Sequence, residues 1–207
     1  MRTVDWYFDF VSPFSYICLH RLQELPGVSI AYRPVLFAGL LNHFGQKGPA
    51  EIPAKRRWTY RWCTWWAQEL GLPFRFPASH PFNPLQHLRL CMVAGSGYEP
   101  IRKIFNDIWT TGADANDPKR IEALCRELEV DPAKLSSEPI KASLKKNTEE
   151  AAARGVFGVP SFVAEGEIFW GADAVDFLKA YLKDSSVLNN AEMRRIDHLP
   201  VGAARKP

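Results

Sequence analysis

Apolar and polar positions begin to alternate almost at the start of the chain. Residues 3–10 alternate and are rich in aromatic side chains, which predicts a strand. Ser12 and Pro13 follow as an N-cap and a first helical position, and the helix is expected to stop at residues 26–27. Residues 28–34 alternate again. A strand–helix–strand unit of this length favours a parallel pair joined by a crossover helix.

The middle of the chain shows helical spacing and almost no strand signal. The expected helices cover residues 53–70, 83–94, 100–110 and 139–154. Asp117 and Asp131 each precede a proline and predict two further helix starts. Gly155 is expected to end the last helix of this block.

Strand signals return after the helical block. Residues 161–164 and 167–170 flank the two-residue turn at 165–166, which is typical of a β-hairpin. A final helix is expected over residues 173–182. The predicted order is therefore βαβ, then a helical block, then ββα.

Composition narrows the class of protein. The 207 residues suit one large domain or one domain with an insertion, and 46% hydrophobic content is ordinary for a folded enzyme. We expect no membrane span and no signal peptide. The formal net charge of +3 is too small to indicate nucleic acid, and two of those charges fall on a tail after residue 190 that is expected to be solvated.

Four cysteines lie far apart in the sequence. Cys18, Cys63, Cys91 and Cys125 form no CxxC pair and no cluster with histidine. We therefore expect free buried thiols, no bound metal and a reducing, cytoplasmic location. His80 and His87 show no ligand spacing either, and we expect them to be surface or packing residues.

The junction between the first strand and the first helix carries the first candidate chemistry. In a thioredoxin fold this junction holds Cys-x-x-Cys, whose first sulfur is tuned by the helix N-terminus. Here the four positions begin with Ser12 and end with Ser15, so no dithiol exchange is available. A serine hydroxyl can still donate a hydrogen bond to an external thiolate. The alternative is that Ser12 only caps the helix.

A second motif precedes the hairpin. Val159 and Pro160 stand where thioredoxin-like folds carry a cis-proline opposite the active helix, with the preceding backbone free to pair with a peptide ligand. A lone Val-Pro pair is weak evidence. Its position before a hairpin and downstream of a capped Ser-Pro makes it considerably stronger.

Three segments in order resemble a known family. Residues 8–16, the Val159-Pro160 loop and residues 169–173 are similar to the glutathione-dependent 2-hydroxychromene-2-carboxylate isomerases, relatives of kappa-class glutathione transferases and DsbA-like proteins. The resemblance covers nearly all of residues 3–183. It implies an α/β thioredoxin-like fold with an all-helical insertion. The thioredoxin-like domain would comprise residues 1–44 and 155–190, with the insertion at 45–154 and a C-terminal tail at 191–207.

The resemblance also implies roles for particular residues. Ser12 would be the catalytic serine and would donate a hydrogen bond to the sulfur of the cofactor glutathione. Val159 would pair with the cysteine of glutathione through its backbone. The γ-glutamyl end would be received by Trp170, Gly171, Ala172 and Asp173. The family pattern after Trp-Gly resembles Asn-Asp-Arg, whereas this chain has alanine at 172 and 174.

Candidate substrate-binding residues come from the expected helical block. Lys55 and Trp58 resemble the family's Lys-x-x-Tyr stretch and share one helix face with Trp62 and Trp65. A cation beside aromatic rings suits an aromatic carboxylate, although a tryptophan stripe is more often core. Asn83 matches a family asparagine near the substrate, and its alternative role is an N-cap.

The resemblance implies a reaction in which glutathione is regenerated. The activity would interconvert 2-hydroxychromene-2-carboxylate, or a similar aromatic carboxylate, and its open-chain isomer. A kappa-type transferase or peroxidase, which consumes glutathione, is the first alternative. A non-catalytic thioredoxin-like binding protein is the second. Related proteins are typically homodimers, and a homodimer is therefore expected.

Overall fold

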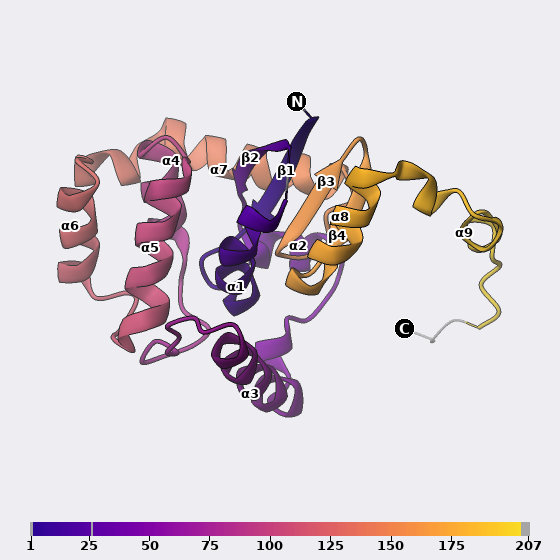
Figure 1. Ribbon diagram of the computed structural model, residues 1–207. Helices are drawn as coiled ribbons and strands as arrows, with labels where there is room; N and C mark the ends of the chain where they lie inside the picture. The colour runs from indigo at the N-terminus through magenta and orange to yellow at the C-terminus, as the bar shows by residue number, and fades with distance from the viewer. Residues whose placement is uncertain (1, 26, 204–207) are drawn as a thin grey trace.

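The computed structural model describes residues 2–25 and 27–203. Its centre is a four-stranded sheet in the order β2-β1-β3-β4 (Figure 1). The strands are β1 (Arg2–Phe8), β2 (Val28–Pro34), β3 (Ser161–Ala164) and β4 (Glu167–Trp170). β1 and β2 run parallel, whereas β3 is antiparallel to both β1 and β4. With only helices between β2 and β3, this topology confirms the expected thioredoxin-like fold with a helical insertion.

The crossover between the parallel strands is α1 (Pro13–Arg21), extended by a 3-10 turn at Leu22–Glu24. β1 ends at Phe8, two residues earlier than predicted, because Asp9 turns the chain toward α1. The predicted stop at residues 26–27 falls partly outside the described residues. Gly27, which is described, has φ of +70°, a backbone conformation suited to ending a helix.

Within the described residues, the elements between β2 and β3 are all helical. They are α2 (Phe37–His43), α3 (Pro53–Glu69), α4 (Leu85–Val93), α5 (Tyr98–Thr111), α6 (Pro118–Glu127) and α7 (Glu138–Ala153), with 3-10 turns at Pro49–Glu51 and Pro132–Ser136. The helix expected after Asp131 is only that second turn, which ends at Ser136, and α7 begins separately at Glu138. The sequence pattern also did not predict α2.

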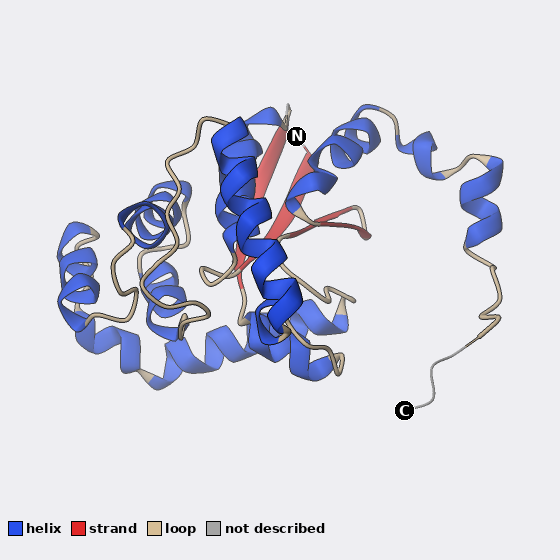
Figure 2. Cartoon of the chain, turned by 90° about the horizontal axis from the view of Figure 1, so that it is seen from below, coloured by secondary structure: helices blue, strands red, loops and turns tan. Residues whose placement is uncertain are grey.

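The alternation of side chains along the strands divides the core between the two faces of the sheet. Trp6, Phe8 and Phe162 are fully buried and belong to the larger cluster, which includes residues of α1, α5 and α8. Tyr7 and Val163 point the other way, into a smaller cluster with residues of α2 and α7. The helices therefore cover both faces, as Figure 2 shows.

After β4, the chain packs α8 against the core and then continues into a segment that has no fully buried residue. A 3-10 turn at Ala172–Ala174 leads into α8 (Val175–Lys183), which buries Val175, Leu178 and Tyr181. A further 3-10 turn (Ser185–Leu188) and α9 (Ala191–Ile196) follow, and α9 has no buried residue. Figure 2 shows α9 standing away from the body of the protein. The predicted tail therefore contains a short helix, and its last four residues lie outside the described part.

The expectation of free, buried thiols is confirmed, since all four cysteines are buried and unpaired. No helix in the described residues combines the length and hydropathy needed to cross a bilayer. The same part of the chain has no group of three or more His, Cys, Asp or Glu side chains placed to hold a metal ion.

Candidate functional site

Ser12 lies between β1 and α1, and it is the N-cap of α1, as predicted. Its Oγ accepts from the Ser15 amide at 3.2 Å, and its own amide donates to the Asp9 carbonyl at 3.1 Å. The Phe14 amide, in the first turn of α1, has no hydrogen-bond partner in the described chain. The N-terminus of α1 therefore presents an unused amide and the positive end of its dipole next to a hydroxyl group.

A buried carboxylate shapes the loop before Ser12. Asp9 is fully buried, and its two oxygens accept from the amides of Val11 at 3.1 Å and Phe37 at 2.8 Å. Burial raises the pKa of Asp9 to about 7, although these amide bonds oppose the rise. Because Phe37 is the first residue of α2, the Asp9 side chain joins the loop to α2.

Two ring nitrogens from the insertion hold the carbonyls of the same loop. Trp109 of α5 donates its indole N–H to the Phe10 carbonyl at 3.0 Å. His80 Nε2 lies 2.8 Å from the Val11 carbonyl. Together with the Asp9 bonds, these contacts tie the main chain immediately before Ser12 to α5, to α2 and to the loop that carries His80. The loop is therefore held rigidly before any ligand arrives.

The His80 ring is fixed in one tautomer. Nε2 must carry the proton to donate to the Val11 carbonyl, so Nδ1 of the neutral ring is an acceptor. The Tyr60 hydroxyl lies 2.6 Å from Nδ1 and 2.8 Å from the His80 carbonyl, and it can donate its one proton to either. Burial lowers the pKa of His80, and the Arg56 charge lowers it further, so the neutral ring is favoured. The sequence pattern treated His80 as a surface or packing residue. No local spacing signals its contact, because 69 positions separate it from Val11.

The Val159-Pro160 loop lies beside this junction. The peptide bond is cis, as the motif predicted. Tyr7 pairs with Ser161 in the antiparallel ladder, so continuing that register places Val159 across from Asp9 and next to the start of α1. Neither the amide nor the carbonyl of Val159 has a partner within the described chain. This short stretch of backbone is therefore open to pair with a peptide-like ligand.

The segment after β4 lies on the other side of the same loop. Trp170 pairs with Ser161, and the Gly171 amide donates to the Pro160 carbonyl at 2.9 Å. Trp170 is 57% exposed, and its indole crosses Gly158, where a Cβ would lie 2.7 Å from Nε1. Gly158 thus has to be glycine for the indole to stay in place. The structure brings Ser12, Val159 and Trp170 to one end of the sheet.

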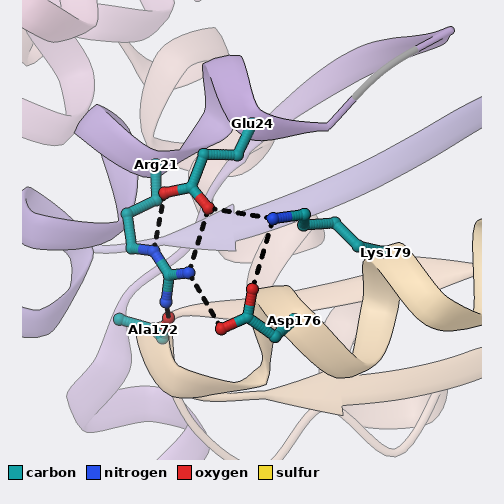
Figure 3. A network of polar contacts seen from close by, with 5 residues as sticks. All are labelled: Arg21, Glu24, Ala172, Asp176 and Lys179. Carbon is teal, nitrogen blue, oxygen red and sulfur yellow. Dashed lines mark hydrogen bonds and ion pairs between the residues drawn. The ribbon is translucent and has the colours of Figure 1, made fainter.

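The remaining residues of that segment differ in exposure. Ala172 is buried and Asp173 is exposed. The Ala172 carbonyl accepts from Arg21 at 3.0 Å, as Figure 3 shows. All the residues assigned to glutathione by resemblance therefore lie at or beside one end of β1, β3 and β4.

Two of the candidate substrate residues, Lys55 and Trp58, lie on α3, which contacts α1. Trp58 is 62% exposed and stacks on Trp62, with ring centroids 5.6 Å apart, and Lys55 is exposed on the same flank of α3. Tyr60, which anchors α3 to the Ser12 loop, is about 200° around the helix from Trp58. No hydrogen bond or ion pair between described residues joins Lys55 or Trp58 to Ser12.

Asn83 has a local structural role in this structure. Its side-chain oxygen accepts from the amide of Leu85, the first residue of α4, at 3.1 Å. Its backbone exchanges two hydrogen bonds with the side chain of Asn116. The N-cap of α4 is Pro84, so Asn83 lies one residue before the position that the capping alternative gave it, and its contacts fix the loop before α4.

Comparisons with known proteins agree with the motifs. Residues 3–183 match the family model of the DSBA-like thioredoxin domain. A 2-hydroxychromene-2-carboxylate isomerase of Sphingobium xenophagum is 31% identical over 88% of this chain and 99% of its own length. A glutathione S-transferase kappa 1 of Homo sapiens is 24% identical over 86% of this chain and 89% of its own.

A solved structure of a 2-hydroxychromene-2-carboxylate isomerase superposes with a TM-score of 0.80 at 27% identity, covering 92% of this chain and 98% of the other. Sequence and structure therefore point to the same group of proteins. This chain belongs to the 2-hydroxychromene-2-carboxylate isomerase family, within the DSBA-like thioredoxin domain proteins.

Proposed function

We propose that the protein is a glutathione-dependent isomerase of 2-hydroxychromene-2-carboxylate or a similar aromatic carboxylate. The observation that carries the proposal is the Ser12 hydroxyl at a helix N-terminus beside the unpaired backbone of Val159. Such a pair suits a ligand that has both a thiol and a peptide backbone. Glutathione has both.

The residues present fit glutathione on chemical grounds. Val159 offers one free amide and one free carbonyl, which is what an extended peptide needs for a two-bond pairing. The first turn of α1 offers the free Phe14 amide for a negative sulfur. Beyond Gly171, the main chain turns into α8, and its N-terminal end suits a carboxylate.

The protein's own groups would stabilise the glutathione sulfur as a thiolate. When bound, glutathione would supply a nucleophilic sulfur that adds to a conjugated carbon, permits bond rotation and leaves unchanged. The Ser12 hydroxyl would donate to that sulfur, and the α1 dipole would lower its pKa below the usual value of roughly 8.5. The many bonds that fix residues 9–12 let these groups act without reorganising.

The substrate's place is the less defined part of the proposal. Lys55 and Trp58 on α3 offer a cation and an exposed aromatic face, which match an aromatic carboxylate. The Tyr60–His80 contact fixes α3 relative to the Ser12 loop, so this face keeps a constant position relative to the sulfur site. We keep Lys55 and Trp58 as candidate substrate residues on that basis, and Asn83 on the resemblance to the family alone.

Replacing Ser12 by alanine tests the proposal. A hydrogen bond to a charged group contributes about 1.5–3 kcal/mol, so Ser12→Ala should lower kcat by about 10- to 100-fold. Ser15→Ala is the matched control, because the Ser15 hydroxyl is buried without a partner. Steady-state isomerisation with saturating glutathione is the measurement. Equal rates for Ser12→Ala and wild type would overturn the assigned role.

A kappa-type transferase is the second candidate, because kappa enzymes are among the relatives. Following total thiol during turnover separates the two, since an isomerase leaves it constant and a transferase consumes it. Calorimetry with glutathione addresses the non-catalytic alternative. Binding weaker than about 10 mM would leave the site largely empty at physiological thiol levels and would exclude both enzymes.

A further inference from the structure

A guanidinium lies behind the segment proposed to hold the γ-glutamyl end. Arg21, in the last turn of α1, has a side chain only 12% exposed and donates through Nη1 to the Ala172 carbonyl at 3.0 Å. Its other nitrogens bind Glu24 at 2.9 and 3.0 Å and Asp176 at 3.2 Å. Lys179 closes the network by bridging Glu24 and Asp176, as Figure 3 shows.

The supported segment has little else to hold it. Neither Gly171 nor Ala174, the N-cap residues of the 3-10 turn and of α8, supplies a side-chain cap. Within the described residues, the Arg21 bond is the only hydrogen bond from a side chain to the backbone of residues 170–174. The alanines at 172 and 174 add no polar group. Among the described residues, Arg21 is thus the one side chain that supports this turn by a hydrogen bond to its backbone, beside the backbone bonds of Gly171 and Ala174.

The peptide group between Ala172 and Asp173 links Arg21 to the proposed glutathione site, because its carbonyl bonds Arg21 and its amide points the other way. In a trans peptide the carbonyl and the following N–H point in opposite directions. The Ala172 carbonyl points at Arg21, so the Asp173 amide points away from it, and that amide has no partner in the described chain. A cation bonded to the carbonyl also polarises the amide at the other end of the plane.

We propose that Arg21 is a positioning residue that aims and polarises the Asp173 amide toward the γ-glutamyl carboxylate of glutathione. The inference rests on the proposed function. Arg21 never touches the ligand in this arrangement. It acts through one peptide group, and α1 carries it at one end with the sulfur-binding Ser12 at the other.

The proposal predicts an effect confined to one part of the ligand. Cysteinylglycine keeps the thiol and the peptide but lacks the γ-glutamyl group. Arg21→Gln should therefore weaken glutathione binding about tenfold or more and change cysteinylglycine binding less than about twofold. A purely structural loss would weaken both ligands equally.

Lys179→Gln is the matched control for charge. It removes one positive charge from the same network without touching the Ala172 carbonyl. It should change the affinity for either ligand less than about twofold. Arg21→Lys keeps the charge but cannot bond the Ala172 carbonyl and both carboxylates together. Its affinity for glutathione should therefore lie between those of the wild type and Arg21→Gln, with the affinity for cysteinylglycine unchanged.

Calorimetric titration of the wild type and the three variants with both ligands is the experiment, with thermal unfolding as a check on folding. If Arg21→Gln does not fold, the test rests on Arg21→Lys, through the ratio of its affinity for glutathione to its affinity for cysteinylglycine, compared with the same ratio for the wild type. Equal losses for both ligands, or no loss for glutathione, would overturn the role of Arg21. A wild type that binds neither ligand would instead overturn the proposed function. A wild type that binds both equally would show that there is no γ-glutamyl subsite.

Discussion

At the scale of single residues, the loop before Ser12 depends on side chains that are distant in sequence. Phe10 is held by Trp109 and Val11 by His80, and both donors belong to the insertion. Asp9 completes the set through Phe37. A hydroxyl that must be positioned to within about 0.5 Å to donate a hydrogen bond to a sulfur needs this kind of support.

Asp9 gives the protein a predictable pH dependence. An aspartate in an unfolded chain has a pKa of about 3.9, whereas burial raises the pKa of Asp9 to about 7. Between these values the folded state holds a proton that the unfolded state has lost. The contribution of Asp9 is therefore most favourable below about pH 4, and it is lost as the pH rises through about 7.

Asp9→Asn should remove this dependence. Asparagine has one acceptor oxygen, so the variant leaves one loop amide unbonded at a cost of about 1 kcal/mol or more. The stability gap between wild type and variant should shrink as the pH rises from about 5 to about 8. Urea unfolding at the two pH values measures the gap. A constant gap would mean that Asp9 is already ionised in the folded protein.

Residue-scale contacts were only partly predictable from the sequence. The Ser12 cap and the Val159-Pro160 bond follow from local rules about serine and proline. His80 and Arg21 act across 69 and 151 positions, and such partners depend on how the elements pack. No pattern in a single sequence encodes that packing.

At the scale of elements, the hairpin was predicted to the residue because its turn chemistry is local. Glu165 and Gly166 both have positive φ, as a two-residue hairpin turn requires. α2 was not predicted, since Leu36 provides no side-chain cap and Phe37 begins the helix through tertiary contacts. One of these is the Asp9 bond, and another joins the Leu36 amide to Thr148 of α7.

Gly171 is the residue on which the turn into α8 depends. Its φ of +102° is a conformation that other residues rarely adopt, and an added Cβ would collide with the Asp173 carboxylate. Gly171→Ala should therefore lower the free energy of unfolding by about 1–3 kcal/mol and weaken glutathione binding.

The control for Gly171→Ala is Gly97→Ala, since Gly97 has φ of −85° and its Cβ would find Pro100 at an ordinary 3.8 Å. Chemical denaturation and glutathione titration of both variants are the measurements. Equal behaviour of the two variants would show that the turn at 171 tolerates a side chain.

At the scale of the whole molecule, the compact body ends with the 3-10 turn at Ser185–Leu188, whose Val187 and Leu188 pack against the core. α9 buries nothing, and Leu199 and Val201 beyond it are exposed. Ending the chain after residue 190 should therefore move the unfolding midpoint by less than about 2 °C and leave glutathione affinity unchanged.

Ending the chain after residue 174 is the contrasting truncation. It removes the buried Val175, Leu178 and Tyr181, and the protein should no longer unfold cooperatively. Calorimetric scans of the two truncated chains compare them directly. A large loss of stability from the shorter deletion would mean that the tail docks on the body.

The four buried cysteines have a practical consequence for the chemistry proposed here. Burial raises the pKa of the Cys18, Cys63 and Cys91 thiols, which keeps them protonated and poorly nucleophilic. A chromogenic disulfide reagent added to the native protein should therefore react slowly with the chain itself. In such an assay the rapid colour comes from glutathione alone. The thiol concentration measured during turnover therefore needs no correction for the cysteines of the protein.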